Sequence, residues 1–151
     1  MANTNTPTGY YPPVGFHFLV KFDEFTGANE MRFQSVNGLS AEIEMETFKA
    51  GGTNMFVYQL PVRVKFSDIT LKRGMLVGSQ ATQWILSSLN QFQFSPTSLT
   101  IMLLDETGSP LMTWKLSGVL PKKWAVSEFN AEQSNLVIEE LVLVAREFFI
   151  S

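Results

Sequence analysis

The sequence predicts a mainly β protein with one helix, and three observations lead to this fold class. Several segments alternate apolar and polar residues with the period of a strand, and turn formers such as Asn-Gly and Gly-Gly separate them. A single segment places its apolar residues three and four positions apart, as a helix does. With 151 residues, 45% of them hydrophobic, the chain can bury a core without a disulfide or a metal ion.

The composition argues against several classes of function. The chain has no cysteine and a single histidine, His17, which excludes disulfide scaffolds, thiol nucleophiles and most zinc sites. A net charge of −3 with scattered basic residues predicts no nucleic-acid specificity. No apolar run approaches the roughly 20 residues of a spanning helix, so no membrane anchor is expected. The 13 Phe, 7 Met and 3 Trp are many for this length, which suggests that another subunit covers some of them.

The N-terminal part is expected to contain an arm followed by a short hairpin. Residues 1–9 are polar and aperiodic, so we expect a flexible arm before a single domain over residues 10–151. Residues 16–22 alternate as a strand. Residues 31–36 form a second expected strand, and the turn former at 26–29 indicates that the two pair as a hairpin.

The most regular alternation lies between residues 41 and 66 and predicts a long hairpin with its tip at 51–54. One antiparallel register places apolar residues opposite apolar residues and acidic opposite basic residues, and a slip of one residue would break both matches. The expected pairs are Ala41 with Phe66, Glu42 with Lys65, Ile43 with Val64 and Glu44 with Arg63. This hairpin would have one apolar face and one charged face.

The C-terminal part is expected to contain the helix and the remaining strands. The helix covers residues 79–92, with Ser79 as its N-cap and Trp84 in a stripe of apolar residues that packs on the core. Pro121 is expected to interrupt the strand pattern. The expected strands lie at residues 99–104, 111–116 and 136–144.

No group of residues has the pattern of a catalytic, metal or cofactor site. His17 lacks the second histidine or cysteine that most metal sites or triads need. Glu42, Glu44 and Glu46 could form a carboxylate cluster for a hard cation or for acid–base chemistry. A solvated charge ladder facing the basic residues of the partner strand is the better interpretation. The adjacent residues 139–140 point to opposite faces of a strand, so they are not expected to act together. Because no candidate site is left, the chain is expected to be no enzyme and to bind no cofactor.

Six motifs, in order along the chain, resemble one protein family. They are Tyr11-Pro-Pro-Val-Gly-Phe-His-Phe18, Phe33-Gln-Ser-Val-Asn-Gly-Leu39, Ile69-Thr-Leu-Lys-Arg-Gly74, Leu103-Leu-Asp-Glu-Thr-Gly108, Pro121-Lys-Lys-Trp124 and the segment from Asn135 to Leu143. Together they cover roughly residues 10–148 and resemble the tail-tube proteins of contractile phages and phage-tail-like injection particles. The resemblance implies two packed antiparallel sheets in a β-barrel-like or sandwich subunit, flanked by the helix at about 79–92.

The resemblance also implies a function and partners. The chain would be a structural subunit of an inner tube, in which homohexameric rings stack into a hollow tube that sheath contraction drives through a target envelope. Its partners would be further copies of itself, a contractile sheath protein, baseplate and cap components, and protein cargo in the lumen. It would be made in the bacterial cytoplasm and assembled into a phage-tail-like particle, which can be extracellular after release.

Two sets of residues follow as candidate sites in such a tube. Residues expected to face the lumen are Glu42, Glu44, Glu46, Arg63 and Lys65. Residues expected to reach an adjacent subunit or ring are Lys49, Gly51, Gly52, Thr53, Asn54, Met55 and Phe56. Two alternative functions stay open at this point: an adaptor ring between tube and baseplate, and a monomeric β-barrel that binds a small ligand in an aromatic pocket.

Overall fold

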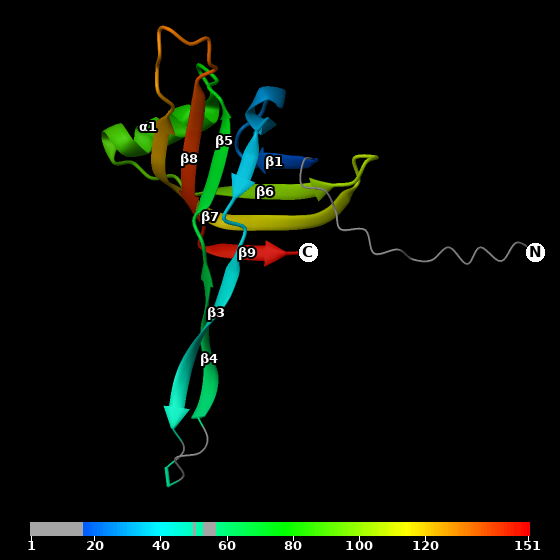
Figure 1. The fold of residues 1–151 in the computed structure, drawn as a ribbon, viewed down its shortest axis with the longest axis vertical. Helices are drawn as coiled ribbons and strands as arrows, with labels where there is room; N and C mark the ends of the chain where they lie inside the picture. The colour runs from blue at the N-terminus through cyan, green and yellow to red at the C-terminus, as the bar shows by residue number, and fades with distance from the viewer. Residues whose placement is uncertain (1–16, 50, 53–56) are drawn as a thin grey trace, which may run out of the picture.

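The computed structural model describes residues 17–49, 51–52 and 57–151, and this part of the chain is mainly β (Figure 1). The elements are β1 (Phe18–Phe22), the 3-10 helix η1 (Ala28–Met31), β2 (Ser35–Asn37), β3 (Ala41–Lys49), β4 (Val57–Phe66), β5 (Ile69–Gly74), α1 (Gln80–Gln91), β6 (Thr97–Leu104), β7 (Pro110–Val126), β8 (Ile138–Val144) and β9 (Glu147–Ile150). The expected arm at residues 1–9 lies outside the described residues.

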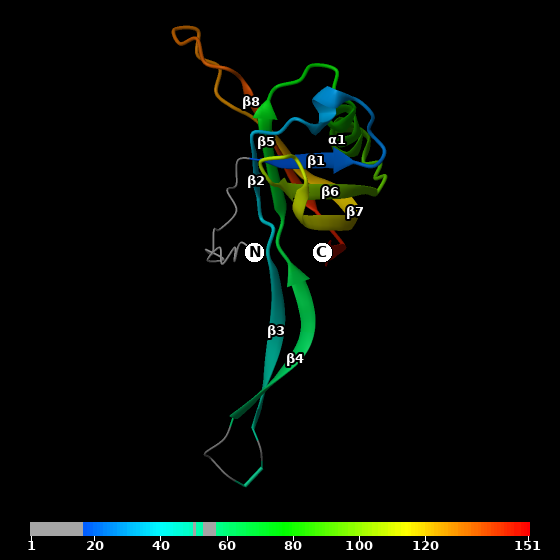
Figure 2. The ribbon, with the colours of Figure 1, turned by 90° about the vertical axis from the view of Figure 1, so that its right-hand side faces the viewer.

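Two antiparallel sheets form the body, and the long strand β7 belongs to both (Figure 2). The first half of β7 pairs with β6 and β9, and β6 pairs with β1. The second half of β7 pairs with β8, and the sheet continues through β5 to β2. The described strands close no barrel, so the body is a sandwich. The expected fold class of two packed antiparallel sheets with one helix is confirmed.

β7 passes from one sheet to the other at Gly118. Its pairing with β6 ends at Val119, and its pairing with β8 begins at Leu120. Gly118 has a φ of +61°, and a Cβ at this position would lie 2.8 Å from the Cβ of Arg146. Only glycine accepts both the left-handed backbone and the close approach. Gly118 therefore allows the bend that connects the two sheets.

The core lies between the sheets, and α1 closes one end of it. Every second residue of the strands points inward, and most of the inward side chains are fully buried. They include Val20, Phe22, Ile69, Leu71, Leu99, Ile101, Leu116, Val119, Leu141 and Leu143, joined by Ala81 and Ile85 of the helix. Because burial of a large apolar side chain is worth about 1.5–3 kcal/mol, this cluster supplies most of the body's stability.

The helix begins where the sequence predicted and buries the predicted stripe except at its C-terminal end. The side-chain oxygen of Ser79 accepts a hydrogen bond from the amide of Thr82 at 3.3 Å, as an N-cap does. Trp84 packs in the core, as expected. Leu89 and Phe92, at the C-terminal end of the stripe, are exposed, and Phe92 forms the C-cap with a φ of 53°. The left-handed cap turns the chain away before Phe92 can reach the core.

The predicted N-terminal hairpin is wrong. Residues 31–36 were expected to form one strand beside β1, but the chain forms η1 and then the short strand β2. β1 pairs with β6, and β2 pairs with β5, so the two predicted partners lie in different sheets. The side chain of Glu30, in η1, accepts hydrogen bonds from Ser79 and from the amide of Gln80, so this segment is held against the start of α1 instead of continuing as a strand.

The chain around Pro121 also differs from the prediction. β7 continues through Pro121 to Val126. The register with β8 shifts between Pro121 and Lys123, and such a bulge accommodates a residue that has no N–H to donate. The strands β5 and β9 are further elements that the alternation pattern did not predict.

β3 and β4 form a separate two-stranded sheet that extends away from the body (Figures 1 and 2). We call this hairpin the arm. It leaves the body through the connections from β2 to β3 and from β4 to β5.

Candidate functional site: the exposed arm

The arm exposes almost all of its described side chains. Every residue of β3 and every residue of β4 except Phe66 is exposed. Among them are eight large apolar residues: Ile43, Met45, Phe48, Val57, Tyr58, Leu60, Val62 and Val64. A monomeric protein seldom presents so many apolar groups together, and such a surface marks an interaction site.

The arm has the register that the sequence predicted over its first four pairs, from Ala41 opposite Phe66 to Glu44 opposite Arg63. Beyond Glu44 the register shifts, because Met45 lies opposite Pro61 and Val62 faces no residue. This is a β-bulge in β4. The strict two-residue alternation of β4 gave no sign of it.

The five residues expected to face a lumen lie on one face of the arm, as the pairing and the alternation along β3 show. Glu42 faces Lys65, and Glu44 faces Arg63, with which it forms an ion pair and a hydrogen bond. The hydrogen bond from Arg63 is the main cause of a lowered pKa of Glu44. Glu46 lies beyond the bulge and faces Leu60 instead of a basic residue.

The residues expected at the tip are only partly described. Lys49 ends β3, and Gly51 and Gly52 form a turn, in which Gly52 has a φ of +95°. The other four tip residues, Thr53, Asn54, Met55 and Phe56, lie outside the described residues.

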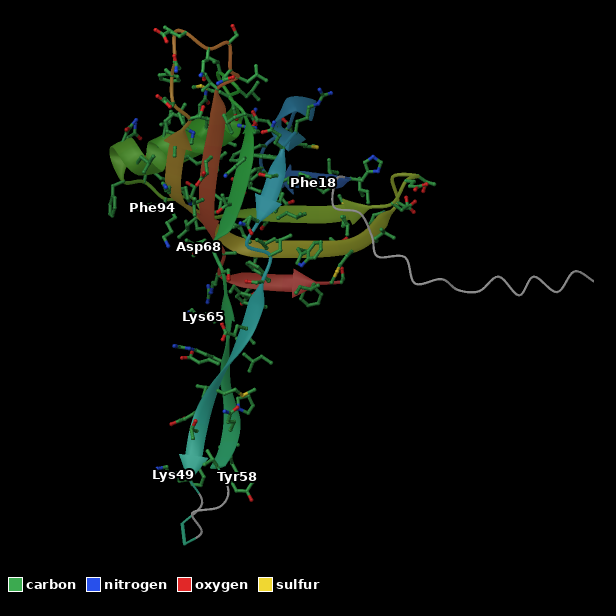
Figure 3. The ribbon with its side chains drawn as sticks, in the orientation of Figure 1. Phe18, Lys49, Tyr58, Lys65, Asp68 and Phe94 are labelled. Carbon is green, nitrogen blue, oxygen red and sulfur yellow. The ribbon has the colours of Figure 1, made fainter. Side chains whose placement is uncertain are left out.

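The root of the arm is fixed to the body by close contacts. The ring of Phe66 stacks on that of Phe148 in β9, with centroids 4.5 Å apart. Gly38, just before β3, lies so close to the chain just after β4 that a Cβ would be 1.9 Å from the carbonyl oxygen of Asp68. The carboxylate of Asp68, which is labelled in Figure 3, also forms an ion pair with Lys122, at 2.5 Å. These contacts hold the point from which the arm extends.

A groove lies beside the root of the arm, along β9. It has a volume of about 520 Å³, and Phe66, Leu116, Phe148 and Phe149 contribute its apolar lining. Phe149 is 71% exposed. Polar side chains, among them Asp23, Lys115 and Glu147, complete the lining, so the groove is an open surface of mixed polarity next to the arm.

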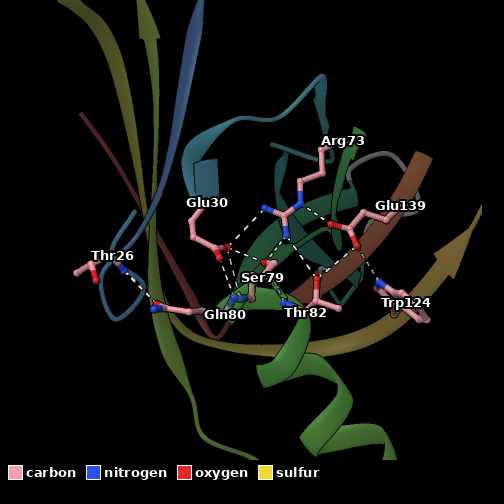
Figure 4. Close-up of polar contacts among 9 residues, drawn as sticks. Thr26, Glu30, Arg73, Ser79, Gln80, Thr82, Trp124 and Glu139 are labelled. Carbon is pink, nitrogen blue, oxygen red and sulfur yellow. Dashed lines mark hydrogen bonds and ion pairs between the residues drawn. The ribbon is translucent and has the colours of Figure 1, made fainter. Parts of the chain in front are cut away.

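The body contains a buried cluster of charged residues, which the sequence analysis did not find (Figure 4). Arg73 of β5 forms ion pairs with Glu139 of β8 and with Glu30 of η1, the latter at 3.6 Å. All three side chains are buried. Thr82 and Trp124 donate hydrogen bonds to Glu139. The cluster joins two strands, η1 and the helix.

The alternation of residues in β5 and in β8 indicates that Arg73 and Glu139 point into the body. Arg73 shares the strand face of Ile69 and Leu71, which are fully buried, so alternation alone places it inward. Glu139 shares the face of the buried Leu141 in the same way. Glu140 points to the other face, where it pairs with Lys72 at 3.7 Å, which confirms that the two adjacent glutamates do not act together.

Comparison with known proteins gives a match over nearly the whole chain. Residues 14–148 match the model of the family described as T4-like virus tail tube protein gp19. The chain belongs to this tail tube family. The resemblance seen in the sequence motifs is thereby confirmed. No curated protein sequence matches the chain.

Solved structures with the tail tube fold are similar over their full length. A chain of the anti-feeding prophage baseplate structure is 27% identical, with a TM-score of 0.82, covering 94% of this chain and 97% of that one. A chain of the sheath–tube complex of an extracellular contractile injection system, PVC, is 25% identical, with a TM-score of 0.78 and coverages of 100% and 99%. A chain of the PVC sheath/tube terminator is also 25% identical, with a TM-score of 0.79 and coverages of 95% and 99%.

Two further observations describe this tail tube protein. The part of the chain that the structure describes holds no group of three or more His, Asp or Glu side chains able to bind a metal ion. None of its helices is long and apolar enough to cross a membrane. The arm and the groove are two of the surfaces of the tube protein that its fold leaves uncovered.

Proposed function

We propose that this chain is the repeating subunit of the inner tube of a contractile injection particle. Six copies close into a ring, and rings stack into a hollow tube that carries cargo. The observation that carries this proposal is the full-length match to the tail tube family, together with the similarity to a sheath–tube complex. The six-fold symmetry named for the similar baseplate structure supports a hexameric ring.

The partners of the proposed tube follow from the same similarities. The similar chains come from structures described as a sheath–tube complex, a baseplate and a sheath/tube terminator. We therefore assign this subunit four contacts: further copies of itself, a contractile sheath protein, a baseplate component and a component that caps the tube. The particle forms in the bacterial cytoplasm and acts outside the cell that produces it.

The charged face of the arm is the proposed lining of the lumen. Glu42, Glu44, Glu46, Arg63 and Lys65 share this face. A balanced, solvated set of charges suits a water-filled channel, because it remains hydrated and attracts neither sign of cargo strongly. The tip from Lys49 to Phe56 would reach an adjacent subunit or ring.

The proposed tube protein performs no chemistry. Its five-residue charged face contains neighbouring acids and bases that neutralise one another, as in the Glu44–Arg63 pair, and none of them is enclosed. Its buried acids Glu30 and Glu139 form ion pairs with Arg73. Incubation with generic ester, phosphoester and glycoside substrates should therefore give no turnover above buffer.

Electron microscopy tests the proposed function directly. Negative-stain images of the concentrated purified protein should show rings of about 6 subunits, and longer tubes at higher concentration. Sedimentation should show a hexamer that dissociates on dilution. A strictly monomeric sedimentation profile at every concentration would overturn the proposal.

An adaptor ring between tube and baseplate is the second candidate. The observation that favours it is the similarity to a chain of a baseplate structure, at a TM-score of 0.82. The two roles differ in copy number, because an adaptor forms one ring per particle and a tube subunit forms many. Quantitative mass spectrometry of purified particles, with the sheath protein as reference, separates them.

A further inference from the structure

The exposed pair Asn37–Gly38, at the end of β2, is a feature that the proposed function does not use. β2 ends at Asn37, which lies opposite Thr70 of β5, and the chain then turns at Gly38 with a φ of +93°. Asn37 is exposed, and Gly38 is half-buried at the root of the arm. The pair combines a side-chain amide that water reaches with a main-chain amide that has no side chain beside it.

The side chain of Asn37 contacts the main-chain amide of Gly38. The N–H of Gly38 donates a hydrogen bond to Oδ1 of Asn37, at 2.8 Å. Because β2 ends at Asn37, this N–H lies outside the pairing of β2 with β5. The bond to Oδ1 places the nitrogen of Gly38 beside Cγ, the carbon atom that carries Oδ1. A nitrogen is thus held next to an electrophilic carbon.

We propose that Asn37 is a site of spontaneous deamidation and isomerisation, with water as the co-reactant. In the first step the nitrogen of Gly38 loses its proton to water and attacks Cγ of Asn37, and the bond from Cγ to the side-chain nitrogen breaks. The departing nitrogen takes up a proton and leaves as ammonia. A five-membered succinimide ring remains, and nothing is oxidised or reduced.

Water then opens the ring in one of two ways. Attack at Cγ breaks its new bond to the nitrogen of Gly38 and leaves an aspartate in an unchanged main chain. Attack at the main-chain carbonyl carbon breaks the original peptide bond and leaves an isoaspartate, in which the main chain runs through Cβ and Cγ. Both routes consume one water molecule and release one ammonia molecule.

The isoaspartate product changes the root of the arm, because it adds a carbon atom to the main chain immediately before Gly38. Gly38 lies so close to the chain after β4 that a Cβ on it would be 1.9 Å from the carbonyl oxygen of Asp68. A longer main chain cannot keep this contact without moving backbone. The aspartate product keeps the length of the main chain and adds only a negative charge at an exposed position.

Asn130 provides a reference within the same molecule. It is also exposed, but its Oδ1 accepts a hydrogen bond from the amide of Glu132, two residues further on, at 2.9 Å. The amide that would have to attack Cγ belongs to Ala131, whose Cβ hinders the approach. Asn130 therefore shares the exposure of Asn37 and lacks both its contact and its glycine.

Incubation of the purified full-length protein at neutral and alkaline pH tests the proposal. Peptide mass spectrometry measures the replacement of an NH₂ group by OH at each asparagine, and electron-transfer fragmentation distinguishes isoaspartate from aspartate. Conversion should be at least about tenfold faster at Asn37 than at Asn130. It should become faster as the pH rises, because the attacking nitrogen must lose its proton. Equal rates at the two asparagines would overturn the proposal.

Comparison with the unfolded chain tests the contribution of the fold. In concentrated urea Asn37 keeps Gly38 as its neighbour but loses the geometry of the root. If the fold holds the nitrogen of Gly38 beside Cγ, conversion in the folded protein should be at least as fast as in urea. Slower conversion in the folded protein would show that the fold protects Asn37, and the proposal would fail.

Two variants complete the test. Asn37→Ser keeps Gly38 but has no amide nitrogen to lose, so the conversion should be absent. Asn37→Asp reproduces the charge of the aspartate product in the original main chain. Hydrogen exchange at residues 39–41 and 66–68 should be faster in the purified isoaspartate form than in the Asn37→Asp protein, and equal exchange would contradict a changed root. None of these measurements requires rings or tubes, so this proposal and the proposed function can fail independently.

Discussion

At the scale of single residues, the buried cluster around Arg73 decides how β5, β8 and η1 meet. Arg73 lies between Glu30 and Glu139, so its one positive charge faces two carboxylates in the interior. It also lies over the ring of Phe33, 5.0 Å from its centroid. A buried charge is tolerated only when partners satisfy it, so these residues depend on one another.

Arg73→Met should destabilise the protein strongly. The change leaves Glu30 and Glu139 buried without their counter-charge, and loss of one partner from a buried ion pair costs about 3–5 kcal/mol. Lys72→Met is the matched control, because Lys72 is the next residue and its ion pair with Glu140 is partly exposed. The control should cost less than about 1 kcal/mol. Urea unfolding measures both, and equal effects would contradict the assigned role of Arg73.

The stability of the protein should depend on Glu30 in acid. Burial opposes ionisation of this carboxyl, but hydrogen bonds from Ser79 and from the amides of Gln80 and Ala81, together with Arg73, outweigh it and lower its pKa below 4.5. A carboxyl with a lowered pKa stabilises the folded state above its unfolded pKa, and this contribution is lost as the pH falls through the folded pKa. The free energy of unfolding should therefore fall below about pH 4.5.

Glu30→Gln separates this contribution from general acid unfolding. The variant should be less stable at neutral pH, and its free energy of unfolding should fall less between pH 5 and pH 3, which is roughly the range of carboxyl titration. Glu128→Gln, a change of an exposed glutamate, should keep the pH dependence of the unchanged protein. Parallel curves for all three proteins would show that Glu30 does not contribute.

At the scale of elements, the joint between arm and body depends on Gly38. The chain before β3 and the chain after β4 touch there, since a Cβ on Gly38 would lie 1.9 Å from the carbonyl oxygen of Asp68. The amide of Ser67 also donates a hydrogen bond to the carbonyl of Ser40 across the joint, at 3.2 Å. These contacts set the direction in which the arm leaves.

Gly38→Ala should therefore loosen the joint. The added methyl group cannot fit without moving backbone, so we expect a loss of more than about 2 kcal/mol of folding stability. Gly52→Ala is the control, because Gly52 also has a positive φ but has open space around it. It should cost only the strain of the left-handed backbone, about 1 kcal/mol. Thermal unfolding and hydrogen exchange at residues 39–41 and 66–68 measure the difference, and equal losses would refute the contact argument.

The sequence predicted the pairing at the root of the arm, but it wrongly paired β1 with the segment that follows it in the chain. The first four pairs of the arm were predictable, because charge and hydrophobicity both match across them. The bulge was not, because the alternation of apolar residues continues without a break through Val62, where the register shifts. The pairing of β1 with β6 joins distant segments, and no local pattern reports it. Likewise, Arg73 and Glu139 meet only because β5 lies beside β8.

At the scale of the whole molecule, the fold separates stability from assembly. The core and the Arg73 cluster lie in the body, while the exposed apolar residues and the charged face lie on an arm that contributes nothing to the core. Changes on the arm can therefore alter contacts between copies without unfolding the subunit.

Charge reversal at Glu44 tests this division. Glu44 lies on the charged face, opposite the face that carries Ile43 and Val64, so Glu44→Lys should leave ring assembly intact and change how strongly an acidic or basic test protein is retained in the tube. Exchanging the pair, with Glu44→Arg and Arg63→Glu, restores the net charge and should return retention to that of the unchanged protein. Co-purification of the test proteins with assembled tubes measures retention. If Glu44→Lys prevents assembly while the exchanged pair assembles, the charged side of the arm lies at an interface between copies and not at the lumen.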